Sequence, residues 1–327
     1  MLMIVAWHVI LNHHAQFSVS SIDWALELLL KGANSVAVNA FILISGYFGI
    51  QFKWERFIRL DIQVLFYSVL LLLVSIFIGW HTFNMRRDFL MFFPVLSKQY
   101  WFITCYVVLY LISPLLNRWA DCMQKSEYKR NLIVGALIIY VWPTICFLFN
   151  AKQFVNDAGY GIVNFTYLYM LGHYIRCYYE DKYTVTHYRG GYFITVILLF
   201  ICQYSLSYFL GFEFTSWLSY NTIFVFVGAI CLFMAFKNTS VSSGIINYWA
   251  KPCLAVYLIH NHPLIWSGFC SFIGVSDFHG MKFLMLVFIL PISIYIVCTA
   301  FEKLRVFFMN GIENRLVYRL THRSVLL

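Results

Sequence analysis

The stretch DIQVLFYSVLLLLVSIFIG, residues 61–79, decides the fold class. Its one charged residue is Asp61, at its first position, and every later residue is uncharged. An α-helix needs about 20 predominantly apolar residues to cross the hydrocarbon core of a bilayer. The stretch therefore predicts a membrane-spanning helix.

The rest of the chain repeats this pattern. Hydrophobic residues make up 61% of the 327 residues, charged residues 11%, and mean hydropathy is +0.74. A soluble domain carries about 25% charged residues. We expect an all-α, polytopic integral membrane protein that forms a single membrane-embedded domain over residues 1–327. Its candidate membrane-spanning segments, about ten, are residues 1–16, 35–50, 61–79, 100–117, 132–149, 160–178, 191–210, 218–236, 248–270 and 281–301.

The distribution of lysine and arginine predicts the orientation of the chain. Positively charged loops remain in the cytoplasm. If the N-terminus is cytoplasmic, 17 of the 23 basic residues fall in inward-facing segments and 6 in outward-facing loops. Ten spans then place both termini in the cytoplasm. The net charge of +9 is spread over many loops, whereas a nucleic-acid-binding protein gathers it on one patch.

Two further features bear on local structure. Residues 20–32, SSIDWALELLLKG, mix charged with large apolar residues, and we expect a short amphipathic helix along the membrane interface. The nine cysteines form no C-x-x-C motif and have no zinc-site spacing with histidine. We therefore expect no structural metal and no disulfide framework.

Ionisable residues at membrane depth mark candidate sites because burying them is costly. His8 interrupts an apolar run and is either a hydrogen-bonding partner for another helix or a general base. His260 lies within segment 248–270, three residues after Tyr257 and on the same helix face. Two histidines in different segments favour a polar cavity within the helix bundle. His13 and His14 follow the first apolar run, and we expect both to be solvated at the outer surface.

The segment FILISGYFGIQFKWERFIRL, residues 41–60, contains two features of interest. Ser45 and Gly46 interrupt an apolar run and predict close helix packing rather than a serine nucleophile. Arg56 and Arg59 are three residues apart and share a helix face. They are either ordinary cytoplasmic flanking charges or a paired guanidinium clamp for phosphate groups. In the next segment, Tyr100 and Trp101 are typical of an interfacial aromatic belt.

The order and spacing of several segments resemble the membrane acyltransferase 3 family, which includes O-acetyltransferases of bacterial surface polysaccharides. The resemblance covers nearly the whole chain. Its pieces are MLMIVAWH (1–8), NAFILISGYF (39–48), the R-x-x-R of Arg56 and Arg59, YWFITCYVVLYLISPLLN (100–117), YLYMLGHYIR (167–176), AICLFMAFKN (229–238) and VYLIHNHP (256–263).

The resemblance implies an acyltransferase of the bacterial cytoplasmic membrane. Such an enzyme takes an acetyl group from cytoplasmic acetyl-coenzyme A, with no permanently bound cofactor, and delivers it to a hydroxyl of a glycan or lipid-linked saccharide. His8 then acts as the general base, and Arg56 and Arg59 hold the coenzyme A phosphates. Trp101, Tyr257 and His260 line the substrate cavity.

The family pattern also places an arginine before the histidine of the first span, with ten residues between them. Counting back from His8 leads to a position before Met1. The apolar run Met1 to Leu11 is about 16 Å long as a helix, about half the thickness of the hydrocarbon core. We therefore expect the native first span, with its arginine, to begin upstream of Met1.

Two other function classes remain open on the sequence. A ten-span bundle with intramembrane histidines is compatible with a proton-coupled transporter or flippase of glycan precursors. Against this, there is no inverted repeat, and Asp61 and Glu302 lie at segment ends. A glycan polymerase or ligase also has many spans, but its outer loops are longer than the short loops expected here. Consumption of acetyl-coenzyme A distinguishes the acyltransferase from both.

Overall fold

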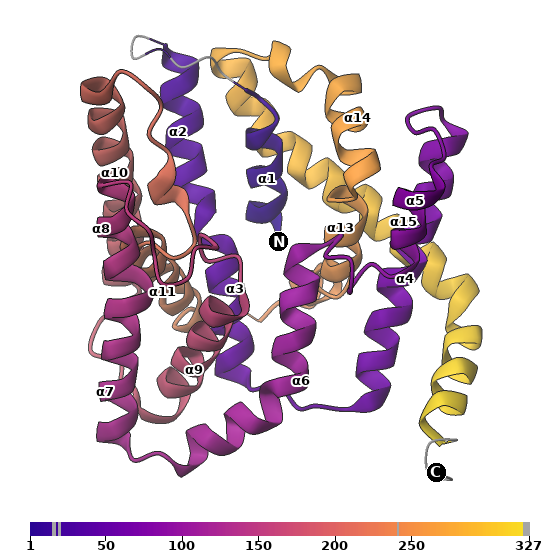
Figure 1. Cartoon of the computed structure of the whole chain (residues 1–327), viewed down its shortest axis with the longest axis horizontal. Coiled ribbons are helices and arrows are strands. Elements are labelled where there is room, and N and C mark those ends of the chain that lie inside the picture. The colour runs from indigo at the N-terminus through magenta and orange to yellow at the C-terminus, as the bar shows by residue number, and fades with distance from the viewer. Residues whose placement is uncertain (15–17, 19–20, 241, 323–327) are drawn as a thin grey trace. The chain divides into compact units, whose positions relative to one another are not determined.

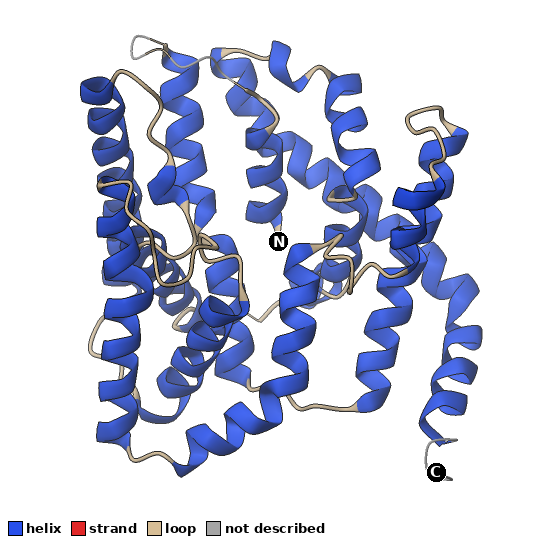
Figure 2. Ribbon diagram, in the orientation of Figure 1, coloured by secondary structure: helices blue, strands red, loops and turns tan. Residues whose placement is uncertain are grey.

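The computed structural model describes residues 1–14, 18, 21–240 and 242–322. The other residues, which include the ends of predicted segments 1–16 and 20–32 and the basic residue Arg323, lie outside the description. The chain is 78% helical, and the described residues form helices and loops without a strand (Figure 2). Seven helices among the described residues are long and apolar enough to cross a membrane. The protein is therefore an all-α polytopic membrane protein, as predicted.

The described chain divides into two compact units, each built from separate stretches of sequence. Unit 1 comprises residues 1–12, 52–107 and 242–327, and unit 2 comprises residues 13–51 and 108–241. The prediction of a single domain over residues 1–327 stays a prediction, as do the number of spans and their orientation.

Unit 1 contains the first helix, the 61–79 helix and the C-terminal helices (Figure 1). Its elements are α1 (Leu2–Leu11), α4 (Trp54–Phe77), α5 (Met85–Asp88), the 3-10 helix η1 (Phe89–Phe92), the first turns of α6 (Trp101–Cys122), α12 (Gly244–Ala250), α13 (Cys253–His260), α14 (Pro263–Ile273), the 3-10 helix η4 (Val275–Asp277) and α15 (Gly280–His322). Apolar residues of α1, α13, α14 and α15, among them Val5, Val256, Cys270 and Leu290, form a common core.

Unit 2 contains the remaining helices and the rest of α6. Its other elements are α2 (Ile22–Ser35), α3 (Ala37–Phe48), α7 (Lys125–Ala136), the π-helix η2 (Leu137–Val141), α8 (Trp142–Leu148), α9 (Ile162–Tyr178), α10 (Val185–Leu210), the 3-10 helix η3 (Ser216–Leu218) and α11 (Ile223–Lys237).

The tightest helix contact in unit 2 joins α3 to α9 through glycines. A Cβ atom on Gly46 would lie 2.1 Å from the carbonyl oxygen of Tyr169, and one on Gly172 would lie 2.4 Å from that of Leu43. Ser45 donates its hydroxyl hydrogen to the Phe41 carbonyl of its own helix. The predicted close packing at Ser45 and Gly46 is thus confirmed, because only hydrogen atoms fit between these two backbones.

The predicted interfacial helix over residues 20–32 is wrong as a separate element. α2 and α3 follow one another with only Val36 between them, and together they form one candidate span of 27 residues, Ile22–Phe48. The buried face of α2 includes a charged residue as well as apolar ones, since Trp24 and Glu27 lie three residues apart and are each at most 3% exposed. The helix that looks amphipathic in sequence therefore packs inside unit 2, where its charged residues have partners.

Many large apolar side chains are exposed on the surface of the described chain, while several uncharged polar ones are fully buried. Phe77 is 91% exposed and Phe307 80%, whereas Asn39 and Gln203 are fully buried. This arrangement is the reverse of that in a soluble protein, and it matches a surface in contact with lipid.

Candidate functional site

Unit 1 brings two predicted site residues, His8 of α1 and His260 of α13, into direct contact. The Nδ1 atom of His8 lies 2.9 Å from the Nε2 atom of His260, and the ring centroids are 5.1 Å apart. The two residues are separated by 252 positions in the sequence. His260 is only 3% exposed, while His8 retains some accessible surface.

The hydrogen bonds around His260 determine which nitrogen of each neutral ring carries the proton. The Nδ1 atom of His260 lies 2.5 Å from the Val256 carbonyl, which can only accept, so this nitrogen is the donor. The Nε2 atom of His260 then accepts a hydrogen bond from Nδ1 of His8. The remaining nitrogen of His8, Nε2, is left unprotonated, with its lone pair available to take a proton.

The break between α13 and α14 explains why His260 is held in this way. α13 ends at His260, and Pro263 begins α14, where a missing N–H costs nothing. His262 caps α14, since its Nδ1 accepts from the Leu264 N–H at 3.3 Å. Its Nε2 therefore donates to the Ser68 carbonyl of α4, also at 3.3 Å. His262 thus fixes the turn that follows His260.

Aromatic side chains surround the histidine pair. The ring of Trp266 lies edge-on to His8 at 6.3 Å and to His260 at 5.6 Å, and Tyr257 lies edge-on to His260 at 6.0 Å. The buried Trp266 Nε1 lacks a hydrogen-bond partner among the described residues. An unpaired N–H donor near a histidine base suits a developing oxyanion.

Tyr257 and Trp101 are two further residues that the sequence predicts in the site. Besides His260, Tyr257 contacts the rings of Tyr100 and Phe102, which flank Trp101 in sequence, at 6.1 and 5.5 Å. Trp101 itself is the first residue of α6 and contacts Phe102 edge-on at 5.9 Å. The role of Trp101 in a substrate cavity stays a prediction.

Arg56 and Arg59 are exposed in the first two turns of α4. They lie on the accessible surface of unit 1, where a phosphate group can reach them. Their phosphate-binding role stays a prediction.

A buried ion-pair network in the C-terminal half of α15 was not predicted from the sequence. Arg305 donates from Nε and Nη2 to both carboxylate oxygens of Glu302, each at 2.8 Å, and it also pairs with Glu313. Tyr67 and Gln63 of α4 donate to the same Glu302 carboxylate, at 2.6 and 3.1 Å. The three-residue spacing of Glu302 and Arg305 was the available signal.

The structure also corrects the prediction for His13, which is not solvated. His13 is 2% exposed, and its Nδ1 lies 2.8 Å from the Glu27 carboxylate. Lys31 pairs with the other oxygen of Glu27 at 2.5 Å. A buried carboxylate needs such partners, so the charges of α2 explain the burial of His13. His14 is exposed, as predicted.

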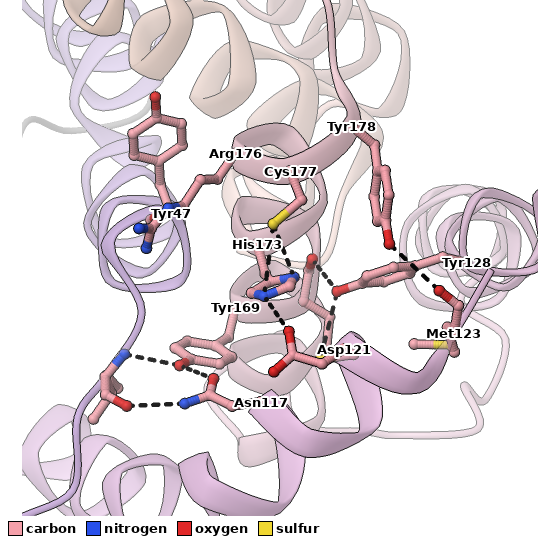
Figure 3. Close-up of polar contacts among 12 residues, drawn as sticks. Tyr47, Asn117, Asp121, Met123, Tyr128, Tyr169, His173, Arg176, Cys177 and Tyr178 are labelled. Atoms are coloured by element: carbon pink, nitrogen blue, oxygen red, sulfur yellow. Dashed lines mark hydrogen bonds and ion pairs between the residues drawn. The ribbon is translucent and has the colours of Figure 1, made fainter. Parts of the chain in front are cut away.

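Figure 3 shows the polar contacts of α9 with its neighbours in unit 2. Tyr169 donates to the Asn117 side chain at 2.6 Å, and Arg176 donates to the Phe48 carbonyl at 2.9 Å. An arginine at the last carbonyls of a helix is a common C-terminal cap. These contacts fasten the end of α3 and have a structural role.

The same view contains a cysteine, a histidine and an aspartate that resemble a nucleophile with its base (Figure 3). The Cys177 sulfur lies 3.9 and 3.8 Å from the two ring nitrogens of His173, and Asp121 lies 3.5 Å from Nε2. The Asp121 side chain is 72% exposed, so this ion pair is weak. Cys177 also lies at the C-terminal end of α9, where the helix dipole disfavours a thiolate. We assign no chemistry to this cluster.

The fold and the histidine pair together define a class: a polytopic helical membrane protein with a proton-accepting imidazole and an unpaired indole N–H near it. A family model for the acyltransferase domain, acyltransferase 3, matches residues 1–302. The chain belongs to this family and is a membrane acyltransferase. Searches of curated proteins and of solved structures each found no match to the chain.

Proposed function

We propose that this protein transfers an acetyl group from cytoplasmic acetyl-coenzyme A to a hydroxyl of a cell-surface or lipid-linked glycan, at the bacterial cytoplasmic membrane. The observation that carries the proposal is the contact between His8 and His260, which leaves Nε2 of His8 free to accept a proton. We also propose that residues 1–327 work as one membrane-embedded domain.

In the proposed reaction, Nε2 of His8 removes the proton from the acceptor hydroxyl as its oxygen attacks the thioester carbonyl. The carbon–sulfur bond then breaks, and the coenzyme A thiolate leaves and takes up the proton from His8. The products are an acetyl ester and free coenzyme A. Removal of a proton by a positioned base contributes about 10²–10⁴-fold to such a reaction.

The surrounding residues have supporting roles in this proposal. His260, anchored on the Val256 carbonyl, holds the His8 ring in one orientation and one tautomer. The unpaired N–H of Trp266 would stabilise the negative charge on the thioester oxygen, and Tyr257 would line the cavity. Trp101 would line the acceptor cavity.

Arg56 and Arg59 would hold the phosphates of coenzyme A. Their planar guanidinium groups suit bidentate phosphate contacts. In the orientation predicted from the basic residues, both arginines face the cytoplasm, where the donor is made available.

A direct test uses the purified full-length protein in nanodiscs with ¹⁴C-acetyl-coenzyme A and glycan-bearing membranes. We expect the label to appear in the glycan and free coenzyme A to be released. His8→Ala should lower the rate by about 10²–10⁴-fold. His14→Ala removes an exposed histidine that follows α1 and should leave the rate unchanged.

The result that overturns the general-base role is a wild-type rate of glycan labelling for His8→Ala at equal protein level. If glycan moves across the membrane without any consumption of acetyl-coenzyme A, the protein acts as a transporter, and the transferase proposal is wrong.

A further inference from the structure

Unit 2 contains a cavity that has no part in the chemistry described above. Its volume is about 60 Å³. Its walls come from the π-helix η2, the start of α8, the loop before α9, the first turn of α9 and the residue before the N-cap of α11. A cavity needs about 10–15 Å³ to hold one water molecule, so this one has room for several heavy atoms. The residues that matter for its chemistry are Ile138, Ile139, Phe154, Asp157, Asn164 and Asn221.

Asn221 lines this cavity and carries an unsatisfied acceptor. The residue is 3% exposed, and its Nδ2 donates to the Gln153 side chain at 3.0 Å. Its Oδ1 has no hydrogen-bond partner among the residues that the structure describes. An unpaired buried carbonyl is costly, and a ligand that donates a hydrogen bond removes that cost.

The backbone around Asn221 is held firmly in place. Tyr220 donates its N–H to the Ala158 carbonyl at 3.0 Å, and a Cβ atom on Gly159 would lie 2.6 Å from the Asn221 nitrogen. The acceptor is therefore positioned by the fold and does not depend on a mobile side chain alone. Such pre-organisation favours binding.

Asp157 supplies a second acceptor in the cavity wall. Its Oδ1 accepts from the Gly159 N–H at 2.9 Å. Asn164, by contrast, is saturated, since its Oδ1 accepts from Tyr140 and its Nδ2 donates to Asn39 and to the Gly159 carbonyl. The cavity lining carries a carboxylate and no cationic side chain. Its polar groups therefore suit a ligand that donates hydrogen bonds, such as a neutral hydroxyl, and disfavour an anion.

The rest of the lining is apolar and includes an exposed ring. Ile138 and Ile139 belong to η2, and π-helical turns inside α-helices occur frequently at functional sites. Phe154 is 79% exposed. A sugar ring has hydroxyls at its edge and C–H groups on its faces. The hydroxyls can donate to the acceptors of the cavity, and the C–H faces can pack against its aromatic and aliphatic side chains.

We infer that this cavity binds the hydroxylated edge of a saccharide, with Asn221 and Asp157 as acceptors and Phe154 against the ring. The inference deepens the proposed function, on which it rests, because it gives the glycan acceptor a binding site in unit 2. It can fail while the acetyl transfer is real, and the following experiment separates the two.

The test measures sugar binding without any acyl donor. Saturation-transfer difference NMR is recorded on the full-length protein in nanodiscs with a panel of methyl hexopyranosides. Methoxycyclohexane, a ring of similar shape without hydroxyls, is the reference ligand. We expect saturation transfer to at least one glycoside, and little to the reference.

Matched substitutions locate the binding. Asn221→Leu should weaken it by about tenfold through loss of one acceptor. Phe154→Ala should weaken binding as well. Because Phe154 is exposed, its substitution should not unfold the protein, and weaker binding then reflects the loss of the ring itself. Asn131→Leu and Phe149→Ala make the same changes at exposed positions outside the cavity and should bind like the wild type.

The inference is overturned if the wild type shows no transfer to any glycoside, if methoxycyclohexane binds equally well, or if the cavity variants bind like their controls. Acetyl transfer that persists alongside any of these results leaves the proposed function intact and places the acceptor elsewhere.

Discussion

The two units bury polar groups at their centres in different ways. Around α1 and α13 of unit 1, the buried groups are imidazoles, and one ring nitrogen of His8 remains available for a proton. Around α3 and α9 of unit 2, they are amides such as Asn39 and Asn164, held near glycine contacts. An amide cannot exchange a proton near neutral pH, whereas an imidazole can. We therefore expect proton transfer in unit 1. In unit 2, the glycine contacts fix the distance between the backbones of α3 and α9.

The largest expected effect tests whether charge also holds unit 1 together. Glu302→Ala removes the carboxylate that binds Arg305, Tyr67 and Gln63, and should destabilise the protein by about 3–5 kcal/mol, because it leaves a buried cation short of a partner. Thermal unfolding in detergent micelles measures the change. Glu55→Ala, at an exposed position on α4, is the control. Equal unfolding temperatures for the two variants would contradict the importance of the network.

A second prediction tests the role of glycine in unit 2. Gly46→Ala inserts a methyl group where only 2.1 Å separates it from the Tyr169 carbonyl, and it should cost about 1–3 kcal/mol or more through overpacking. Gly190→Ala is a suitable control, since its Cβ meets nothing within 4 Å and alanine favours a helix. The α3–α9 interpretation fails if Gly46→Ala is as stable as the control variant.

The third prediction tests His260 as the residue that positions His8. His260→Ala should lower kcat by about 10–100-fold, because a residue that orients another functional side chain typically contributes that much to activity. The KM for acetyl-coenzyme A should change little. His260→Gln retains an acceptor for the His8 N–H and should restore part of the rate, while His279→Ala, at an exposed position, should have no effect. A His260→Gln variant no more active than His260→Ala would argue for a merely structural role.

The smallest expected effect concerns the two arginines of α4. Arg56→Lys combined with Arg59→Lys keeps the charge but loses the planar fork, and should raise the KM for acetyl-coenzyme A by about 3–10-fold. With 3′-dephospho-acetyl-coenzyme A as donor, the difference from wild type should shrink. Arg315→Lys, at an exposed position on α15, serves as the control. An unchanged KM with the normal donor would leave the arginines as flanking charges only.

The features that depend on the cost of burial are the ones that could be predicted. Long uncharged segments predicted the helices, and His8 and His260 were predicted as site residues because histidine is costly inside an apolar run. The environment of α2 could not be predicted. Hydropathy alone does not reveal that Glu27 finds His13 and Lys31 inside unit 2, and so the segment resembled a surface helix.

The amino-acid sequence by itself determined that this chain is a polytopic helical membrane protein, because a backbone in lipid must satisfy its own hydrogen bonds and only long apolar helices do so cheaply. It also identified the polar residues whose burial in the membrane costs enough free energy that we expect them to have a function. Only the tertiary structure decided which of them meet. His8 and His260 lie 252 positions apart, and the available nitrogen depends on the Val256 carbonyl at the end of a broken helix. Hydrogen-bond direction follows from three-dimensional contact, which spacing along a chain does not encode.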